Sequence, residues 1–155
     1  MTNGPDLAQR RAKHALGAVT AYRDAKYRDD EERKKSHSAY ASYIKSAPAA
    51  IVMNGLGQML ASELAQGGKD SAKGQGGVKP HAHRQIFLHL QDWLCGDDPE
   101  AVFRSAKGDN TRLLTQLYGA NQPEYLRAQA EALLYLGWLK KFAGALLADD
   151  AGDRP

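Results

Sequence analysis

Apolar residues recur along this chain at intervals of three and four positions, and no alternation of apolar and polar residues extends over four residues or more. Such spacing places apolar side chains on one face of an α-helix, whereas a strand requires a spacing of two. We therefore expect an all-α fold, a compact bundle of six to seven helices in a single domain that covers residues 1–155. The expected helices run from 7 to about 24, from within 26–35 to about 47, from Pro48 onward, and over about 80–95, 99–106, 109–119 and 121–143.

The last of these helices is the most apolar. Ala, Leu, Glu, Gln, Arg and Lys dominate residues 125–143, and no proline interrupts them. These residues have high helix propensity. Because apolar side chains cover most of its circumference, we expect this helix at the centre of the core.

The helix predicted from Pro48 contains two glycines, Gly55 and Gly57. A glycine inside a helix costs roughly 0.5–1 kcal/mol relative to alanine, so both positions require a compensating reason. The usual reason is the close approach of another helix or of a ligand. We favour tight helix packing, with Asn54 holding a neighbouring loop and with Asn54 and Gln58 forming an edge for hydrogen bonds. Core-facing positions in this helix have helical spacing: Val52, Leu56, Met59, Leu60 and Leu64.

Two segments are expected to lie outside the helices. Residues 67–79 contain five glycines and predict a flexible internal loop, and residues 149–155 predict a disordered tail. The glycine-rich segment lacks the preceding strand and the Gly-Lys-Ser/Thr ending of a phosphate-binding loop.

Composition limits the class of protein. An apolar content of 43% and a charged content of 25% are typical of a globular chain, and no run of 18 apolar residues is present. The N-terminal residues lack the pattern of a secretory signal, and the single cysteine, Cys95, fits a reducing cytoplasm. We expect a cytoplasmic protein in which Cys95 is a small buried side chain near a helix end.

The net charge of +3 is unevenly distributed, because residues 1–45 contain ten Lys and Arg against six Asp and Glu. This surplus is compatible with binding a polyanion, but it is much weaker than the basic stripe of a dedicated nucleic-acid domain.

The sequence offers little that predicts catalysis. His81 and His83 are two positions apart, which places their side chains about 200° apart on a helix, so with His89 they are expected to be surface histidines rather than metal ligands. We expect no metal, no cofactor and no enzymatic activity. A deep polar pocket would favour an enzyme if it gathered four side chains: His14, His37, Tyr40 and Tyr43.

Two segments resemble a known family. Residues 40–58, which include Asn54, Gly55 and Gly57, resemble the first signature of the small helical subunit of the type III-B CRISPR effector, the Cmr complex. Residues 125–143, with Glu131-Ala132 and Trp138, resemble its second signature, and the two occur in the expected order. The long glycine-rich insertion and the weak overall basicity depart from what the family implies.

The resemblance implies a non-catalytic subunit of an RNA-guided antiviral effector. Copies of it would stack beside the backbone subunits, and together they would line the channel that holds CRISPR RNA and target RNA, with the large subunit as a further partner in the complex. The RNA-binding residues expected on this basis are Lys45, Lys140, Lys141 and Arg127, together with Arg10, Arg11, Lys34 and Lys35 from the N-terminal surplus. A helical scaffold or adaptor that binds other proteins without nucleic acid remains the alternative.

Overall fold

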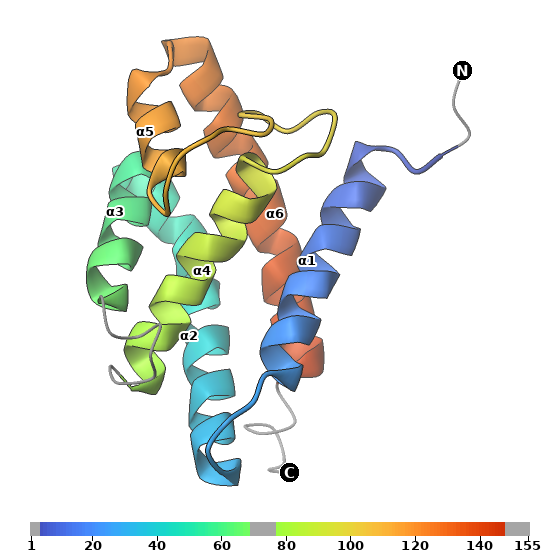
Figure 1. Ribbon diagram of the computed structural model, residues 1–155, viewed down its shortest axis with the longest axis vertical. Helices are drawn as coiled ribbons and strands as arrows, with labels where there is room; N and C mark the ends of the chain where they lie inside the picture. The colour runs from blue at the N-terminus through green and yellow to red at the C-terminus, as the bar shows by residue number, and fades with distance from the viewer. Residues whose placement is uncertain (1–3, 69–76, 148–155) are drawn as a thin grey trace.

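The computed structural model describes residues 4–68 and 77–147. Over these ranges the chain forms helices and no strand, which confirms the all-α bundle (Figure 1). The six described helices are α1 (Leu7–Asp24), α2 (Asp30–Asn54), α3 (Leu56–Gly67), α4 (Val78–Leu94), α5 (Arg112–Gly119) and α6 (Gln122–Leu146). Most of the predicted loop and the whole predicted tail, residues 149–155, lie outside the described residues.

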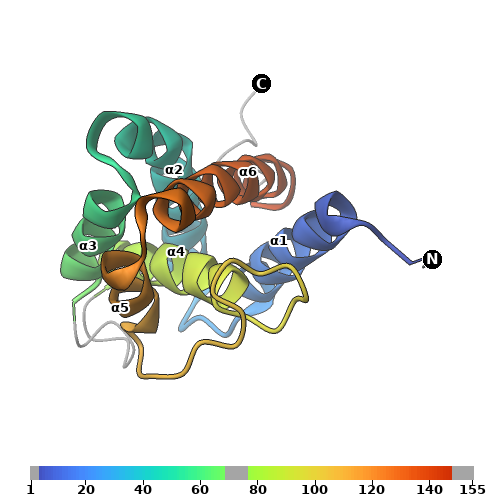
Figure 2. The ribbon, with the colours of Figure 1, turned by 90° about the horizontal axis from the view of Figure 1, so that it is seen from above.

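The helices pack around one hydrophobic core. α1 and α6 run in the same direction, and α2 runs antiparallel to both (Figure 1). Viewed from above, α4 lies between α3 and α1, and α6 lies beside α4 (Figure 2). α6 packs against α1, α2, α4 and α5, as expected of a central helix, although Leu126 and Leu134 on its surface are more than half exposed.

Local capping explains where the longer helices begin. The Asp6 side chain accepts a hydrogen bond from the backbone N–H of Gln9, and the Gln9 side chain accepts one from the backbone of Asp6. Asn121 caps α6 in the same way by accepting from Glu124. These caps satisfy backbone donors that a helix leaves unpaired in its first turn. The predicted starts near Asp6 and Asn121 are confirmed.

The predicted boundary at Pro48 is wrong. α2 continues through Pro48 to Asn54, and the helix is interrupted at Gly55, whose φ is +86°. The break changes the helical phase between Val52 and Leu56, so these residues do not share one face. Val52 is 75% exposed, contrary to the prediction, whereas Leu56 is buried.

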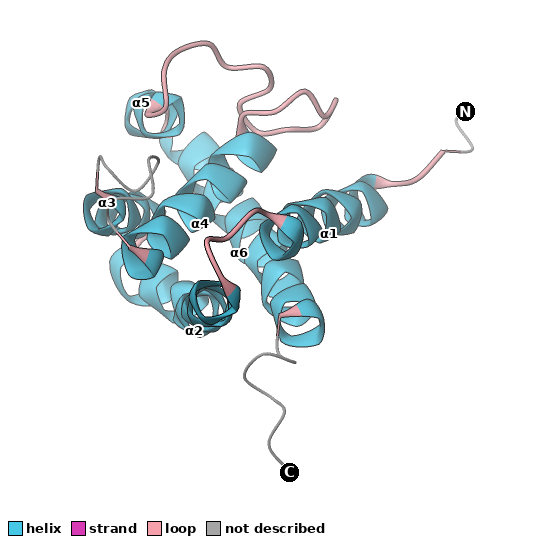
Figure 3. Cartoon of the chain, turned by 60° about the horizontal axis from the view of Figure 1, so that its bottom comes forward, coloured by secondary structure: helices cyan, strands magenta, loops and turns pink. Residues whose placement is uncertain are grey.

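The helix predicted over residues 99–106 is also absent. These residues form turns in the long connection between α4 and α5 (Figure 3). The connection folds back on the end of α4, where the N–H groups of Phe103 and Ser105 donate to the carbonyls of Leu94 and Gly96 at 2.9 and 2.8 Å. Phe103 is buried, and the backbone of this segment bonds to the end of α4, to the residues just after it and within its own turns instead of forming a helix.

Candidate nucleic-acid interface

The corner between α2 and α3 brings the two sequence signatures together. The N–H of Leu56 donates to Gln129 Oε1 at 3.0 Å, and the N–H of Gly57 donates to the Tyr125 hydroxyl at 2.9 Å. The Tyr118 hydroxyl donates to the carbonyl of Gly57 at 3.1 Å. Residues from α5 and α6 thereby satisfy backbone groups at the start of α3, where the capping position Gly55 has no side chain to do so.

Gly55 and Gly57 are required for different reasons. Gly55 lies between two helices with a positive φ, a conformation that other residues rarely adopt. A Cβ at Gly57 would lie 2.9 Å from Cε1 of Tyr118, which confirms the predicted close approach of a neighbouring helix. Asn54 does not hold a loop as expected, because its exposed side chain makes no hydrogen bond with a described residue.

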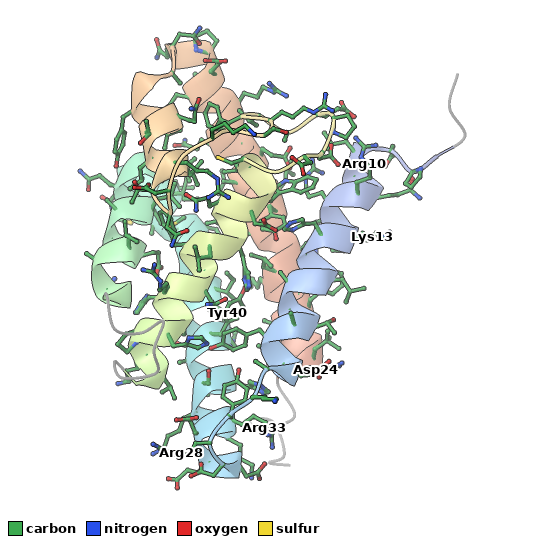
Figure 4. All side chains as sticks on the ribbon, viewed as in Figure 1. Arg10, Lys13, Asp24, Arg28, Arg33 and Tyr40 are labelled. Carbon is green, nitrogen blue, oxygen red and sulfur yellow. The ribbon has the colours of Figure 1, made fainter. Side chains whose placement is uncertain are left out.

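Four of the basic candidates are already paired within the chain. Arg10 lies in a fork of Asp98 and Glu100, with Nε 2.8 Å from Asp98 and Nη2 2.7 Å from Glu100, and these hydrogen bonds raise the pKa of the guanidinium. Lys34 and Lys35 face Asp30 and Glu31 one helical turn earlier, at 3.8 and 3.1 Å. Figure 4 shows Arg10 and Lys13 near one end of α1, and Arg28 and Arg33 at the opposite end of the bundle.

Arg11, the fourth, is predicted from the sequence to bind RNA, but the structure does not leave it on an exposed face. Its side chain is buried, and its guanidinium forms a bidentate ion pair with Glu131, whose carboxylate also accepts a hydrogen bond from Trp93 Nε1 at 2.8 Å. Glu131 of the second signature thus has a structural role. Sequence reasoning missed this ion pair because its two residues are 120 positions apart.

Lys45, Lys140 and Lys141 are exposed and have no ion pair with a described residue. Lys141 Nζ lies 5.2 Å from the centroid of the Trp138 ring, and Trp138 stacks on Phe142 with ring centroids 5.5 Å apart. The C-terminal half of α6 therefore presents Lys141 beside two partly buried aromatic rings, an arrangement that resembles single-strand nucleic-acid sites, and Lys140 is exposed on the same half of the helix.

The register of α2 and α6 relates Lys45 to this group. The hydrogen bond from Leu56 to Gln129 places the end of α2 beside the first half of α6, and the two helices are antiparallel (Figure 1). Each helix rises about 1.5 Å per residue. A residue about ten positions before this hydrogen bond in α2 is therefore at the same height as a residue about ten positions after it in α6. Lys45 therefore lies at the height of Lys140 along the bundle. Arg127 is also exposed, but it lies near the N-terminal end of α6, and its guanidinium donates a hydrogen bond to the carbonyl of Glu100 at 3.1 Å.

Residues 7–146 match the model of a protein family described as CRISPR-associated protein (Cas_Cmr5). The chain belongs to the CRISPR-associated Cmr5 family. The match extends from the first residue of α1 to the last residue of α6, so it covers the whole bundle. Membership confirms the resemblance drawn from the two signatures and makes the chain a small subunit of the type III-B Cmr complex, with the other subunits as its partners.

The three histidines predicted to lie on the surface of this Cmr5-family chain are partly or fully buried: His83 is buried, and His81 and His89 are of intermediate exposure. His81 stacks on Tyr22 with ring centroids 5.7 Å apart, and the Tyr40 hydroxyl lies 2.9 Å from His89 Nδ1. Burial lowers the pKa of His89 to about 4, so the ring is neutral at physiological pH. Among the described residues, no three His, Cys, Asp or Glu side chains are grouped so as to hold a metal ion.

The four side chains that would favour an enzyme are not gathered in one pocket. His14 lines a cavity of about 730 Å³ between α1 and α4, where it lies 2.8 Å from Asp92 and 2.6 Å from the Tyr135 hydroxyl. Tyr43 lines a different cavity, Tyr40 is fully buried, and His37 packs in the core against Tyr22.

Two further properties of the Cmr5-family chain follow from its helices. Cys95 is buried at the end of α4, as predicted, and burial raises the pKa of its thiol to about 11. None of the helices in the described ranges is long and apolar enough to cross a membrane.

Proposed function

We propose that this Cmr subunit is non-catalytic and that Lys45, Lys140 and Lys141 face the channel that holds CRISPR RNA and target RNA. Copies of the chain stack beside the backbone subunits in the cytoplasm, and the assembly acts in antiviral defence. The single observation that supports this placement is the division of the cations. The candidate cations Arg10, Arg11, Lys34 and Lys35 are paired within the chain, whereas the three lysines Lys45, Lys140 and Lys141 have no carboxylate partner among the described residues.

Unpaired lysines have a physical advantage for RNA. A cation already bonded to a carboxylate must give up that partner before it contacts phosphate, whereas an unpaired lysine only releases counterions from the RNA. Three such residues per copy suffice when several copies line one groove, because phosphate contacts add along the strand. Sequence recognition is left to base pairing between guide and target in RNA-guided effectors.

The decisive variant changes Lys140→Glu and Lys141→Glu together. In the assembled complex we expect weaker binding of target RNA and a slope of log affinity against log salt that is shallower by about 1–2 for each copy of the subunit, because up to two phosphate contacts per copy are lost. The matched control is Arg104→Glu with Lys107→Glu, two exposed cations in the connection between α4 and α5. Binding isotherms at several salt concentrations measure both quantities. Equal losses in the two double variants, or none in either, would exclude a local RNA contact on α6.

A protein-binding adaptor that contacts no RNA is the second candidate, and exposed apolar side chains support it. Val52 and Met53 at the end of α2 are 75% and 81% exposed, and Tyr118 on α5 is 61% exposed. Apolar exposure of this kind favours contacts with another protein. If the lysine variant leaves RNA affinity unchanged while Met53→Ser prevents assembly of the complex, the adaptor replaces the RNA-lining proposal.

A further inference from the structure

A polar pocket of about 420 Å³ lies among α2, α3 and α4, and the RNA proposal does not use it. Its walls are mainly amide and hydroxyl side chains together with one aromatic ring. None of the described residues that line it is a lysine or an arginine. The polar lining residues are Tyr43, Ser46, Asn54, Gln58, Ser62 and Gln66.

Two ionisable side chains, Glu63 and His83, complete the pocket. Their exposed fractions are 8% and 9%, and Glu63 Oε2 lies 2.5 Å from His83 Nδ1. The other oxygen, Oε1, accepts no hydrogen bond from a described residue. Burial raises the pKa of Glu63, although the bond to His83 opposes this shift. Solvent reaches this oxygen from the pocket, so it can accept a hydrogen bond from a guest that carries donors.

The remaining pocket atoms favour a donor-rich guest over an anion. Gln66 donates its Nε2 to Ser62 Oγ at 3.2 Å, which leaves its amide oxygen as an acceptor. The amide of Asn54 at the end of α2 and that of Gln58 in the first turn of α3 supply two more carbonyl oxygens. A phosphate would meet the Glu63 carboxylate here and no lysine or arginine among the described lining residues, so we do not expect the backbone of RNA to bind in this pocket.

An aromatic wall adds a preference for a flat guest. The Tyr43 ring stacks on the His83 imidazole with centroids 3.9 Å apart and an interplanar angle of 13°. A guanidinium is planar, stacks on aromatic faces and presents five donors in a rigid fork. A lysine ammonium would also neutralise the carboxylate, but it is not planar and does not present donors in a rigid planar arrangement.

We propose that this pocket binds an arginine side chain from a partner protein, with the guanidinium paired to Glu63 Oε1 and lying along Tyr43. The described lining of the site includes none of Lys45, Lys140 and Lys141, and the site requires no RNA. It gives this subunit a protein contact that is specific for one residue type. The carboxylate supplies the charge, the amide oxygens accept the remaining donors, and the Tyr43–His83 stack sets the plane.

The test titrates the full isotopically labelled chain with N-acetyl-arginine methylamide and follows backbone amide shifts by NMR. The isosteric but neutral citrulline derivative and the lysine derivative are the matched probes. We expect saturable shifts in the segments around Tyr43, Ser62 and His83 with the arginine probe, weaker binding of the lysine probe and none of the citrulline probe. Two variants complete the design: Glu63→Gln removes the buried charge, and Gln58→Lys places an ammonium at the exposed rim without touching the Glu63–His83 pair.

Each variant should weaken arginine binding by about tenfold or more, because a charge-assisted hydrogen bond is lost or a cation is repelled. Melting curves will show whether each variant is folded. If Glu63→Gln does not fold, Gln58→Lys, whose side chain is exposed, still tests the proposal. Equal binding of arginine and citrulline, or shifts outside the pocket, would overturn the proposal, as would a single-stranded RNA oligonucleotide that shifts the pocket residues when arginine does not. Because the free chain is titrated without the other subunits, a negative result here leaves the proposed RNA contact of α6 untouched.

Discussion

At the scale of single residues, the signature glycines act through contacts that no local rule reveals. Gly57 sits where two tyrosines from other helices bond to its N–H and its carbonyl. The prediction of a close approach came from the propensity cost alone, and it held for Gly57. At Gly55 the cause is different, because a positive φ ends α2 there. The sequence showed only that each glycine has an energetic cost in a helix that must be compensated. The packed structure shows that the compensation differs: a positive φ at Gly55 and a close contact at Gly57.

Gly57→Ala should lower the free energy of unfolding by about 1–2 kcal/mol, because the new methyl group would overlap the Tyr118 ring and crowd the Tyr125 hydroxyl. Gly137→Ala in α6 is the matched control, because no neighbouring atom lies within 4 Å of a Cβ at that position. It should raise stability by about 0.5–1 kcal/mol through helix propensity. Urea denaturation measures both, and a stabilising Gly57→Ala would contradict the packing explanation.

At the scale of elements, the internal proline of α2 and the turns after α4 account for the two boundary errors. Proline was expected at the start of a helix, the position it prefers. In the bundle it lies inside α2, which packs against α3, α4 and α6. Packing along 25 residues of α2 outweighs one missing hydrogen bond. The turns after α4 are held by their bonds to Leu94 and Gly96.

Pro48→Ala should therefore stabilise the bundle, by about 1–3 kcal/mol, because it restores a backbone N–H and removes the clash of the ring with the preceding turn. Pro48 is only partly buried, so the smaller side chain leaves little unfilled space. The free energy of unfolding from denaturant titration tests this. A loss of stability would mean that the proline shapes α2 in a way the bundle requires.

At the scale of the whole molecule, the interior contains titratable groups whose protonation is linked to folding. His89 lies beside Tyr40 between helices, and burial is the main reason that its pKa falls from the usual 6.5 to about 4. The unfolded chain therefore binds more protons than the folded chain between pH 6.5 and 4. Stability is lost as the pH falls through this window.

We expect the free energy of unfolding to fall between pH 6.5 and 5 with a contribution from His89 that approaches about 1.4 kcal/mol per pH unit. His89→Gln keeps an acceptor for the Tyr40 hydroxyl and should flatten this dependence. Glu63, whose pKa is raised, contributes with the opposite sign in both proteins, so the comparison with the variant isolates His89. Denaturant titrations at pH 7, 6 and 5 measure the slopes, and identical slopes would show that His89 does not titrate as proposed.

The sequence by itself determined the all-α class, the starts of α1 and α6 and the family. Each of these depends on residues close together in the chain: helical periodicity, the caps at Asp6 and Asn121, and two short signatures. Only the tertiary structure decided which cations are paired and which polar groups meet. Arg10 and Asp98 are 88 positions apart, and Arg11 and Glu131 are 120 apart, so no periodicity relates them. The polar pocket at Glu63 and His83 has the same origin, because charges and hydrogen bonds depend on distance in space, and that distance is set when the helices pack.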